Sequence, residues 1–184
     1  MRIVGGEKRG FQLKGPYVER VRPAMDKVKD SLFSMLYPLE TEELEILDVF
    51  AGTGSIGLEA LSRGCKHATF VEANKIMAKN IKDNIELLDY SEKADVLNKD
   101  FRIALRILYK NEEKFDIIFS DPPYNLGLVN EFFKILKKYN VLKEKGLLIM
   151  EIDKSELPKK ILDFKIVKER SYGRTNILIF QQTV

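Results

Sequence analysis

The sequence predicts an α/β protein with a mostly parallel sheet, helices on both faces and an antiparallel hairpin at the end. Three observations predict it. From residue 46 onward, short apolar runs alternate with segments whose apolar residues recur at helical spacing. A glycine turn follows the first apolar run, as it does in doubly wound sheets. The last two apolar runs are joined by a short turn, so they are expected to pair antiparallel.

Residues 1–44 are expected to form a small hairpin and helix extension packed on the core. Ile3-Val4 and Phe11–Leu13 flank Gly5-Gly6 and a charged turn, which predicts a short hairpin. Arg22-Pro23 opens a helix, because proline is tolerated in the first turn. The apolar face of that helix consists of Met25, Val28, Leu32, Met35 and Leu36. Pro38 and the acidic stretch 40–45 then act as a connector.

Residues 45–184 are expected to form the main domain. The predicted strands are Ile46–Phe50, Ala68–Glu72, Ala94–Asn98, Phe115–Ser120, Leu147–Ile152, Lys165–Glu169 and Ile177–Gln181. The predicted helices between them are Ile56–Arg63, Met77–Leu88, Arg102–Leu108 and Val129–Tyr139. Strand and helix alternation of this kind is typical of a parallel sheet covered on both faces.

Composition narrows the class of protein. With 184 residues, 45% of them hydrophobic and 32% charged, the chain is an ordinary globular protein. No apolar run is long enough to span a bilayer, and charges near residue 1 are unlike a secretory signal. Cys65 is the only cysteine, so no internal disulfide forms and a reducing cytoplasm is expected. His67 is the only histidine, so no zinc cluster and no bound metal are expected.

Positive charge is concentrated at the N-terminus. Residues 1–22 hold six Lys or Arg against two Glu, which leaves −1 of the total +3 for the rest of the chain. A basic head on a nearly neutral body fits a protein that holds a polyanion at one edge, although a solvated basic arm would look the same.

A glycine turn opens the predicted cofactor site. Gly52 and Gly54 follow the first strand and let backbone approach a ligand, while Gly57 allows close packing of helix on strand. Glu72 ends the next strand, where a carboxylate can accept from both ribose hydroxyls. Ala51 and Ala73 flank these positions and belong to the same predicted site. The spacing equals that of dinucleotide-binding proteins, so NAD is an alternative ligand.

Asp48 favours a different ligand. It lies at the carboxyl end of the first strand, four residues before Gly52. A pyrophosphate there would face an uncompensated carboxylate, which is costly in a partly dry pocket. S-adenosylmethionine carries no phosphate but has an ammonium and a sulfonium. An acidic floor therefore favours S-adenosylmethionine over NAD.

Asp100 and Phe101 follow the third strand. The Asp100 carboxylate could accept from an adenine amine while the Phe101 ring packs on the purine. The same residue also suits a helix N-cap, and the two readings stay open.

Asp121-Pro122-Pro123-Tyr124 directly follows the fourth strand. The two prolines restrict the backbone, so a stiff corner presents the Asp121 carboxylate and the Pro122 carbonyl as two acceptors. Two acceptors suit the two hydrogens of a base NH₂. Asp121 could also take the proton as the amine reacts, and Tyr124 could stack on the target base.

Several segments together resemble the RsmD family of bacterial 16S rRNA guanine-N2 methyltransferases, over nearly the whole chain. They are 1–6, Lys8–Gly10, Arg22-Pro23, Leu32-Phe33, 47–64, Phe70–Glu72, Asp121–Tyr124 and Tyr172-Gly173. Ala24 departs from the family, which usually has threonine there. The resemblance implies a Rossmann-like class I methyltransferase sheet, a monomeric enzyme acting during small-subunit assembly, and ribosomal RNA as substrate. It also implies a cofactor pocket of Asp48, Gly52, Gly54, Glu72 and Asp100.

The basic head then has a predicted role. Arg2, Lys8, Arg9 and Arg22 are expected to contact RNA phosphates beside the flipped base. Three alternatives remain at this point: an adenine-N6 methyltransferase acting on DNA or RNA, an NAD-dependent oxidoreductase, and a non-catalytic RNA-binding module. The clamp alone does not distinguish guanine from adenine, because it grips any NH₂.

Overall fold

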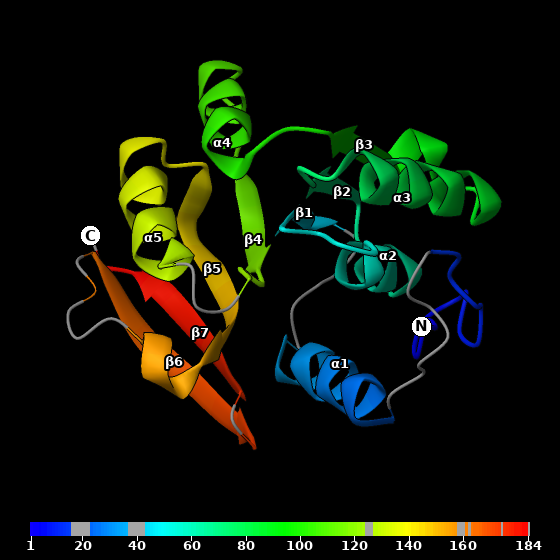
Figure 1. Cartoon of the computed structure of the whole chain (residues 1–184), viewed down its shortest axis with the longest axis horizontal. Coiled ribbons are helices and arrows are strands. Elements are labelled where there is room, and N and C mark those ends of the chain that lie inside the picture. Colours follow the sequence, from blue (N-terminus) through cyan, green and yellow to red (C-terminus); the bar gives the residue numbers. More distant parts are fainter. Residues whose placement is uncertain are drawn as a thin grey trace.

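Seven strands form one sheet in a computed structural model that describes residues 1–15, 23–36, 43–123, 127–157, 161, 163–173 and 175–183. The strand order is β3-β2-β1-β4-β5-β7-β6 (Figure 1). The strands are β1 (Glu45–Val49), β2 (His67–Val71), β3 (Ala94–Leu97), β4 (Phe115–Ser120), β5 (Leu142–Asp153), β6 (Phe164–Tyr172) and β7 (Thr175–Gln182). β1 to β5 pair in parallel, and β7 is antiparallel to both β5 and β6. The predicted sheet, including its final hairpin, is confirmed.

The helices alternate with the first five strands. They are α1 (Pro23–Leu36), α2 (Ser55–Ser62), α3 (Lys75–Leu87), α4 (Phe101–Lys110) and α5 (Leu128–Lys138). Two short 3₁₀ turns, Ser91–Lys93 and Lys154–Glu156, precede β3 and follow β5. α1 begins at Pro23 as the sequence predicts; Arg22 lies outside the described residues.

Each face of the sheet has its own hydrophobic layer. α4 and α5 cover one face, where Leu105 and Phe132 pack against Ile118 and Met150. α1, α2 and α3 cover the other face (Figure 1). Leu32 of α1 belongs to the same buried cluster as Ile117, Phe119 and Ile149 of the sheet. Burial of large apolar side chains on both faces explains why these strands read as apolar runs in the sequence.

The N-terminal segment forms the predicted hairpin. The backbone N–H of Ile3 donates to the Phe11 carbonyl at 3.0 Å, and Arg2 pairs with Gln12 as an antiparallel bridge. Ile3 and Leu13 are fully buried against α2 and α3. Gly6 has φ 76°, and a Cβ there would lie 1.8 Å from the Ser62 carbonyl oxygen. The glycine pair therefore lets the hairpin lie directly on the end of α2.

Three strands are longer than the sequence predicts. β5 begins at Leu142 rather than 147, because Leu142 pairs with Phe115 before an irregularity that contains Lys145 at φ 64°. β6 and β7 run three and two residues further toward their connecting turn, where paired backbone extends past the apolar run. None of the described helices is both long and apolar enough to cross a membrane.

Candidate active site

A cleft opens at the carboxyl ends of β1 and β4, where the strand order reverses direction. β1 contributes Asp48, the turn after it contributes Ala51 and Gly52, and Asp121 follows the end of β4. Val49 and Ser120 are register partners, so the residues after both strands meet at the same edge. The glycine turn and the Asp-Pro-Pro corner, far apart in sequence, therefore border one cleft.

Sequence reasoning missed most of the walls of this cleft. They are Met1, Lys29, Leu32, Phe50, Thr53, Ser55, Ile56, Phe119, Ser120, Ile149, Glu151 and Ile177. Four apolar members, Leu32, Phe119, Ile149 and Ile177, come from α1, β4, β5 and β7, which lie side by side only after the sheet has formed. No local signal marks these four as site residues. The parity of the strands does place Phe119 and Ile149 on the face that α1 covers.

The glycine turn brings backbone close to the cleft. Gly54, at φ 71°, precedes α2, and no side chain caps the start of that helix. Gly57 makes the close packing that the sequence predicts, since a Cβ there would lie 2.3 Å from the Phe70 ring. Phe50 has φ 62°, a conformation that costs free energy for a residue with a side chain and that recurs at binding sites.

Asp48 lies on the floor of the cleft and is only 4% exposed. Its Oδ2 accepts from the Gly57 backbone N–H at 3.1 Å. Burial raises the pKa of Asp48 to about 8 against the lowering effect of that hydrogen bond, and the charges of Asp121 and Glu72 raise it further. A cation bound beside this carboxyl would restore its charge, whereas an anion would add to its cost.

Glu72 joins the glycine turn to the start of α3. One carboxylate oxygen accepts from the Gly52 N–H at 2.8 Å, and the other accepts from the Asn74 N–H at 2.7 Å. Each oxygen keeps a further lone pair, so the carboxylate remains able to accept from hydroxyls. The Ala73 carbonyl accepts from the Asn98 side chain at 3.1 Å, which fixes the loop that carries both residues.

Asp100 caps α4, one of the two readings the sequence leaves open. Its carboxylate accepts from the Arg102 N–H at 2.9 Å and pairs with the Arg102 guanidinium at 2.7 Å. That guanidinium also pairs with Glu131 at 2.6 Å, an ion pair that lowers the pKa of Glu131.

The predicted packing of the Phe101 ring on a purine stays a prediction, and in the structure the ring faces the core. Phe101 is only 3% exposed, and its ring lies 5.0 Å from the Phe50 ring and 6.0 Å from the Phe132 ring. The Arg102 guanidinium covers it at 4.6 Å. As the first residue of an amphipathic helix, Phe101 points into the core, where it supports Phe50.

Asp121 lies exposed at the mouth of the cleft, and the adjoining Pro122 is buried. Although the residue as a whole is exposed, loss of solvation around its carboxyl raises the pKa of Asp121 to about 7, and the charge of the nearby Glu151 raises it further. A carboxyl with a pKa near neutrality is suited to accepting a proton. Tyr124, the predicted stacking residue, lies outside the described residues.

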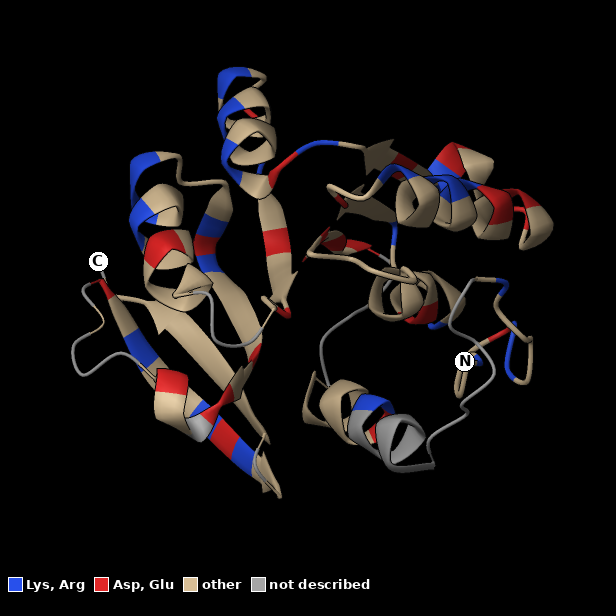
Figure 2. Ribbon diagram, in the orientation of Figure 1, with Lys and Arg blue, Asp and Glu red and all other residues tan. Residues whose placement is uncertain are grey.

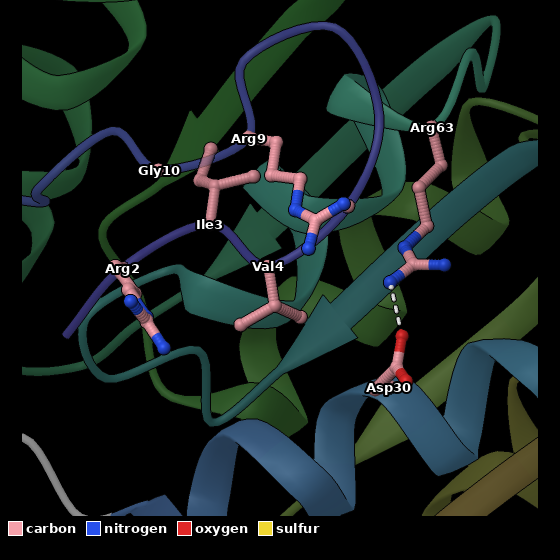
Figure 3. A pocket seen from close by; sticks show the side chains of 8 residues that line it. Arg2, Ile3, Val4, Arg9, Gly10, Asp30 and Arg63 are labelled. Carbon is pink, nitrogen blue, oxygen red and sulfur yellow. Dashed lines mark hydrogen bonds and ion pairs between the residues drawn. The ribbon is translucent and has the colours of Figure 1, made fainter.

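A second pocket lies beside the hairpin and contains three arginines. Arg2, Arg9 and Arg63 line it together with Asp30 (Figure 3). The Arg63 guanidinium is held in place by Asp30 at 3.1 Å and by the buried Glu59 at 2.9 Å. We call this pocket the arginine pocket, and the cleft that contains Asp48 and Asp121 the acidic cleft. Met1 lines the acidic cleft and Arg2 lines the arginine pocket. Because these two residues are consecutive, the two pockets lie next to each other.

Of the three predicted RNA-binding residues that the structure describes, only two lie together. Arg2 and Arg9 share the arginine pocket. Lys8 instead pairs with Asp89 at 3.7 Å and lies 5.7 Å from the centre of the Tyr90 ring. Arg22 lies outside the described residues. Arg63, which sequence reasoning missed, takes part in the pocket because α2 ends against the hairpin.

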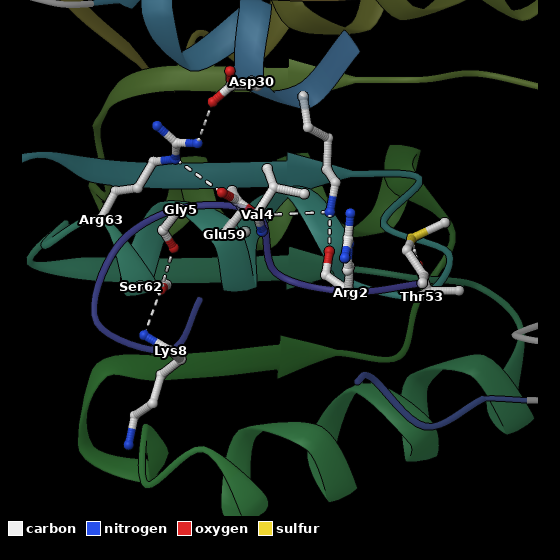
Figure 4. Close-up of polar contacts among 12 residues, drawn as sticks. Arg2, Val4, Gly5, Lys8, Asp30, Thr53, Glu59, Ser62 and Arg63 are labelled. Carbon is white, nitrogen blue, oxygen red and sulfur yellow. Dashed lines mark hydrogen bonds and ion pairs between the residues drawn. The ribbon is translucent and has the colours of Figure 1, made fainter. Parts of the chain in front are cut away.

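Glu59 ties the hairpin, α1 and α2 together (Figure 4). Its carboxylate is 0% exposed, accepts from the Val4 N–H at 2.8 Å and pairs with Lys29 at 3.6 Å and with Arg63. Lys29 also donates to the Arg2 carbonyl. Ser62 donates to the Gly5 carbonyl at 2.7 Å and accepts from the Lys8 N–H at 3.0 Å. These bonds fix the positions of the hairpin, α1 and α2, which border the two pockets, relative to one another.

The residues present fit S-adenosylmethionine better than a dinucleotide. Asp48 and Glu72 place two carboxyls around the glycine turn, and the arginines lie in the neighbouring pocket rather than at the turn. The described part of this cleft therefore suits a cationic ligand with ribose hydroxyls and disfavours a pyrophosphate.

Comparison with known proteins gives matches along almost the entire chain. The family described as "Conserved hypothetical protein 95" matches residues 1–181. The Haemophilus influenzae protein named ribosomal RNA small subunit methyltransferase D is 35% identical, covering 98% of this chain and 93% of its own. The Escherichia coli protein of the same name is 31% identical, covering 99% and 90%.

Solved structures agree with the fold. That of the Escherichia coli protein yhhF has a TM-score of 0.84 at 30% identity and covers 99% of this chain and 97% of its own. More distantly, the structure of SMU.776 complexed with SAH has a TM-score of 0.68 at 14% identity, over 88% of this chain and 50% of that one. At that identity the likeness concerns the fold alone.

Proposed function

The chain belongs to the RsmD family of S-adenosylmethionine-dependent methyltransferases, and on this premise we propose that it methylates the exocyclic N2 amine of a guanine in small-subunit ribosomal RNA. One observation carries the proposal. The Asp121 carboxyl, fixed by the proline corner, borders the same cleft as the buried Asp48 and the glycine turn. A hydrogen-bond acceptor for an amine and a carboxyl that favours a cation therefore border the same cleft, which supports the proposal.

S-adenosylmethionine supplies a methyl group bound to a positively charged sulfur. The protein's part begins with Asp48, whose carboxyl regains its charge beside a cation and so contributes to binding. Glu72 offers its remaining lone pairs to ribose hydroxyls. The start of α2, which no side chain caps, and the glycines before it allow backbone to approach the ligand without a side chain in the way.

Asp121 addresses the weak reactivity of the amine. An exocyclic amine is a poor nucleophile because its lone pair is delocalised into the ring. With the Pro122 carbonyl, Asp121 accepts from both amine hydrogens and turns the nitrogen lone pair out of the ring plane. As the N–C bond forms, the nitrogen loses a proton, and the raised pKa of Asp121 suits it as the acceptor. Holding the amine nitrogen in line with the methyl carbon and the sulfur would lower the activation barrier further.

The arginine pocket holds the RNA beside the reacting base. A base must leave its stack to enter the cleft, and this costs least in an unpaired region. The phosphate next to that base then lies near Met1 and Arg2, where the two pockets adjoin. Arg2 and Arg9 neutralise it, and Arg63 adds positive charge although Glu59 and Asp30 already hold it.

The direct test is transfer of labelled methyl from S-adenosylmethionine to small-subunit particles from a strain that lacks the gene. Digestion to nucleosides should place the label in N2-methylguanosine. Label in N6-methyladenosine would favour the adenine enzyme instead. Absence of transfer to both particles and free small-subunit RNA would contradict the proposal.

A further inference from the structure

We propose that Glu151 determines which base is methylated, by accepting a hydrogen bond from the ring N1–H of guanine while Asp121 holds the neighbouring amine. The inference rests on the proposed function and adds a specificity-determining residue that sequence reasoning did not find. It follows from the register of two strands, the shape of the cleft and the pattern of hydrogen-bond donors on the two purines.

The register of β4 and β5 places the two carboxyls side by side. The strands are parallel, and Ser120 is the register partner of Met150. Asp121 and Glu151 are the next residues of their chains, so they occupy adjacent positions at the same sheet edge. Both line the cleft, and the charge of Glu151 acts on Asp121. Two neighbouring acceptors thus face one ligand.

The walls of the cleft suit a flat ring. Leu32, Phe119, Ile149 and Ile177 provide apolar surface from α1, β4, β5 and β7. Ile177 is the register partner of Glu151, so the apolar wall continues directly beside that carboxyl. Among the described lining residues, Asp48, Asp121 and Glu151 are acidic and Lys29 is basic, and Lys29 is paired with the buried Glu59. An apolar slot with an acidic rim selects a planar ligand whose edge carries donors.

Guanine has such an edge and adenine does not. On guanine, the 2-amine and N1–H are adjacent donors. On adenine, the 6-amine lies beside N1, which is an acceptor and would face the Glu151 carboxylate lone pair to lone pair. A site built to bond a particular N–H rejects an analogue that lacks it. With adenine, the Glu151 carboxylate would meet a second acceptor instead of a donor. Asp121 alone can accept a hydrogen bond from the amine of either purine. Asp121 and Glu151 together distinguish guanine from adenine.

The experiment compares binding of two nucleosides to the full chain. 2-Aminopurine riboside keeps the 2-amine but lacks the N1 hydrogen, and its fluorescence reports binding; guanosine is measured by competition. Wild type is expected to prefer guanosine by about tenfold or more, the range of a hydrogen bond to a charged acceptor. In Glu151→Gln the preference should fall toward one, since a rotated amide can donate to a bare N1.

The matched control is Glu144→Gln, an exposed glutamate on the same strand that should leave the preference at its wild-type value. Glu151→Ala should also abolish the preference. Because the preference is a ratio within one protein, a loss of stability common to both ligands cancels. The 6-oxygen of guanosine contributes equally in wild type and variants, so only the change on substitution counts.

Three results would overturn the inference: no guanosine preference in wild type, the same preference in Glu151→Gln, or no binding of either nucleoside. Methyl transfer to small-subunit particles separates this failure from that of the proposed function. If wild type forms N2-methylguanosine in particles while the nucleoside preference ignores residue 151, the function stands and the role of Glu151 is wrong.

Discussion

Asp48 shows how a single residue defines the ligand that a glycine turn accepts. Buried under the turn with one backbone N–H donated to it, its carboxyl has a pKa raised to about 8. The spacing of the glycines alone is compatible with NAD. The Asp48 carboxyl below the turn disfavours the phosphates of NAD. Asp48 is therefore as informative about the ligand as the glycines are. Its position could be predicted from the sequence because it lies near the end of a clear strand, before a clear glycine turn.

Asp48→Asn should stabilise the protein, and more so at high pH. The folded protein keeps the proton of Asp48 up to about pH 8, whereas the unfolded chain releases it near the ordinary value of 3.8. The wild-type free energy of unfolding therefore falls as pH rises between these values. The variant removes this loss, on the order of 6 kcal/mol at pH 9, and binds S-adenosylmethionine more weakly.

Urea unfolding from pH 5 to pH 9 measures the effect. Asp121, with its pKa raised to about 7, adds a decline of the same sign that both proteins share. Glu92→Gln, at an exposed position, should follow the wild-type curve. An Asp48→Asn curve parallel to the wild-type curve would mean that Asp48 is ionised in the folded protein across this range.

At the scale of elements, the sequence predicted the features that depend on neighbouring residues in the chain. The order of strands and helices, the start of α1 at Pro23 and the close approach at Gly57 follow from short stretches of sequence. The cleft walls do not, because Leu32, Ile149 and Ile177 meet only through pairing of β4, β5 and β7 and docking of α1. The core packing of Phe101 was not evident from the sequence for the same reason, since an aromatic residue at a helix start can face either ligand or core.

Gly57→Ala should destabilise the protein by roughly 1 to 3 kcal/mol, the usual cost of overpacking. The added methyl meets the Phe70 ring at 2.3 Å, so α2 must shift away from β2 together with the glycine turn. Affinity for S-adenosylmethionine should fall too, because the turn carries the ligand-facing backbone. Urea unfolding and calorimetry measure the two effects.

The double variant Gly57→Ala, Phe70→Leu provides the control. A smaller side chain at residue 70 makes room for the methyl, so the second substitution should cost less in the alanine background than alone. Equal costs in both backgrounds would show that the two residues do not compete for the same space.

In the whole molecule, the hairpin lies between the acidic cleft and the arginine pocket. Met1 and Arg2 line the two pockets in turn, and Glu59 binds hairpin, α1 and α2 into one unit. Lys and Arg also lie on α4 and α5 (Figure 2), on the opposite face of the sheet. The distribution of Lys and Arg alone therefore does not predict where RNA binds. We propose the arginine pocket because it adjoins the acidic cleft.

Arg9→Ala should reduce the salt dependence of RNA binding. Each phosphate contact with single-stranded RNA contributes about −0.7 to the slope of log K against log salt. Loss of one contact should make the slope shallower by about that amount, as measured with small-subunit RNA across a salt series. Lys138→Ala, on α5, should leave the slope unchanged. If the two variants behave alike, the arginine pocket is not the phosphate site.

The central claim is that the proline corner holds Asp121 where it binds a base amine beside a separately bound methyl donor. Calorimetry with S-adenosylmethionine, paired with methyl transfer to small-subunit particles, tests it in Asp121→Ala. Affinity for S-adenosylmethionine should stay within about threefold of wild type, while transfer should fall by at least about 100-fold, the usual contribution of a positioned proton acceptor. Transfer at a near-normal rate would contradict the claim.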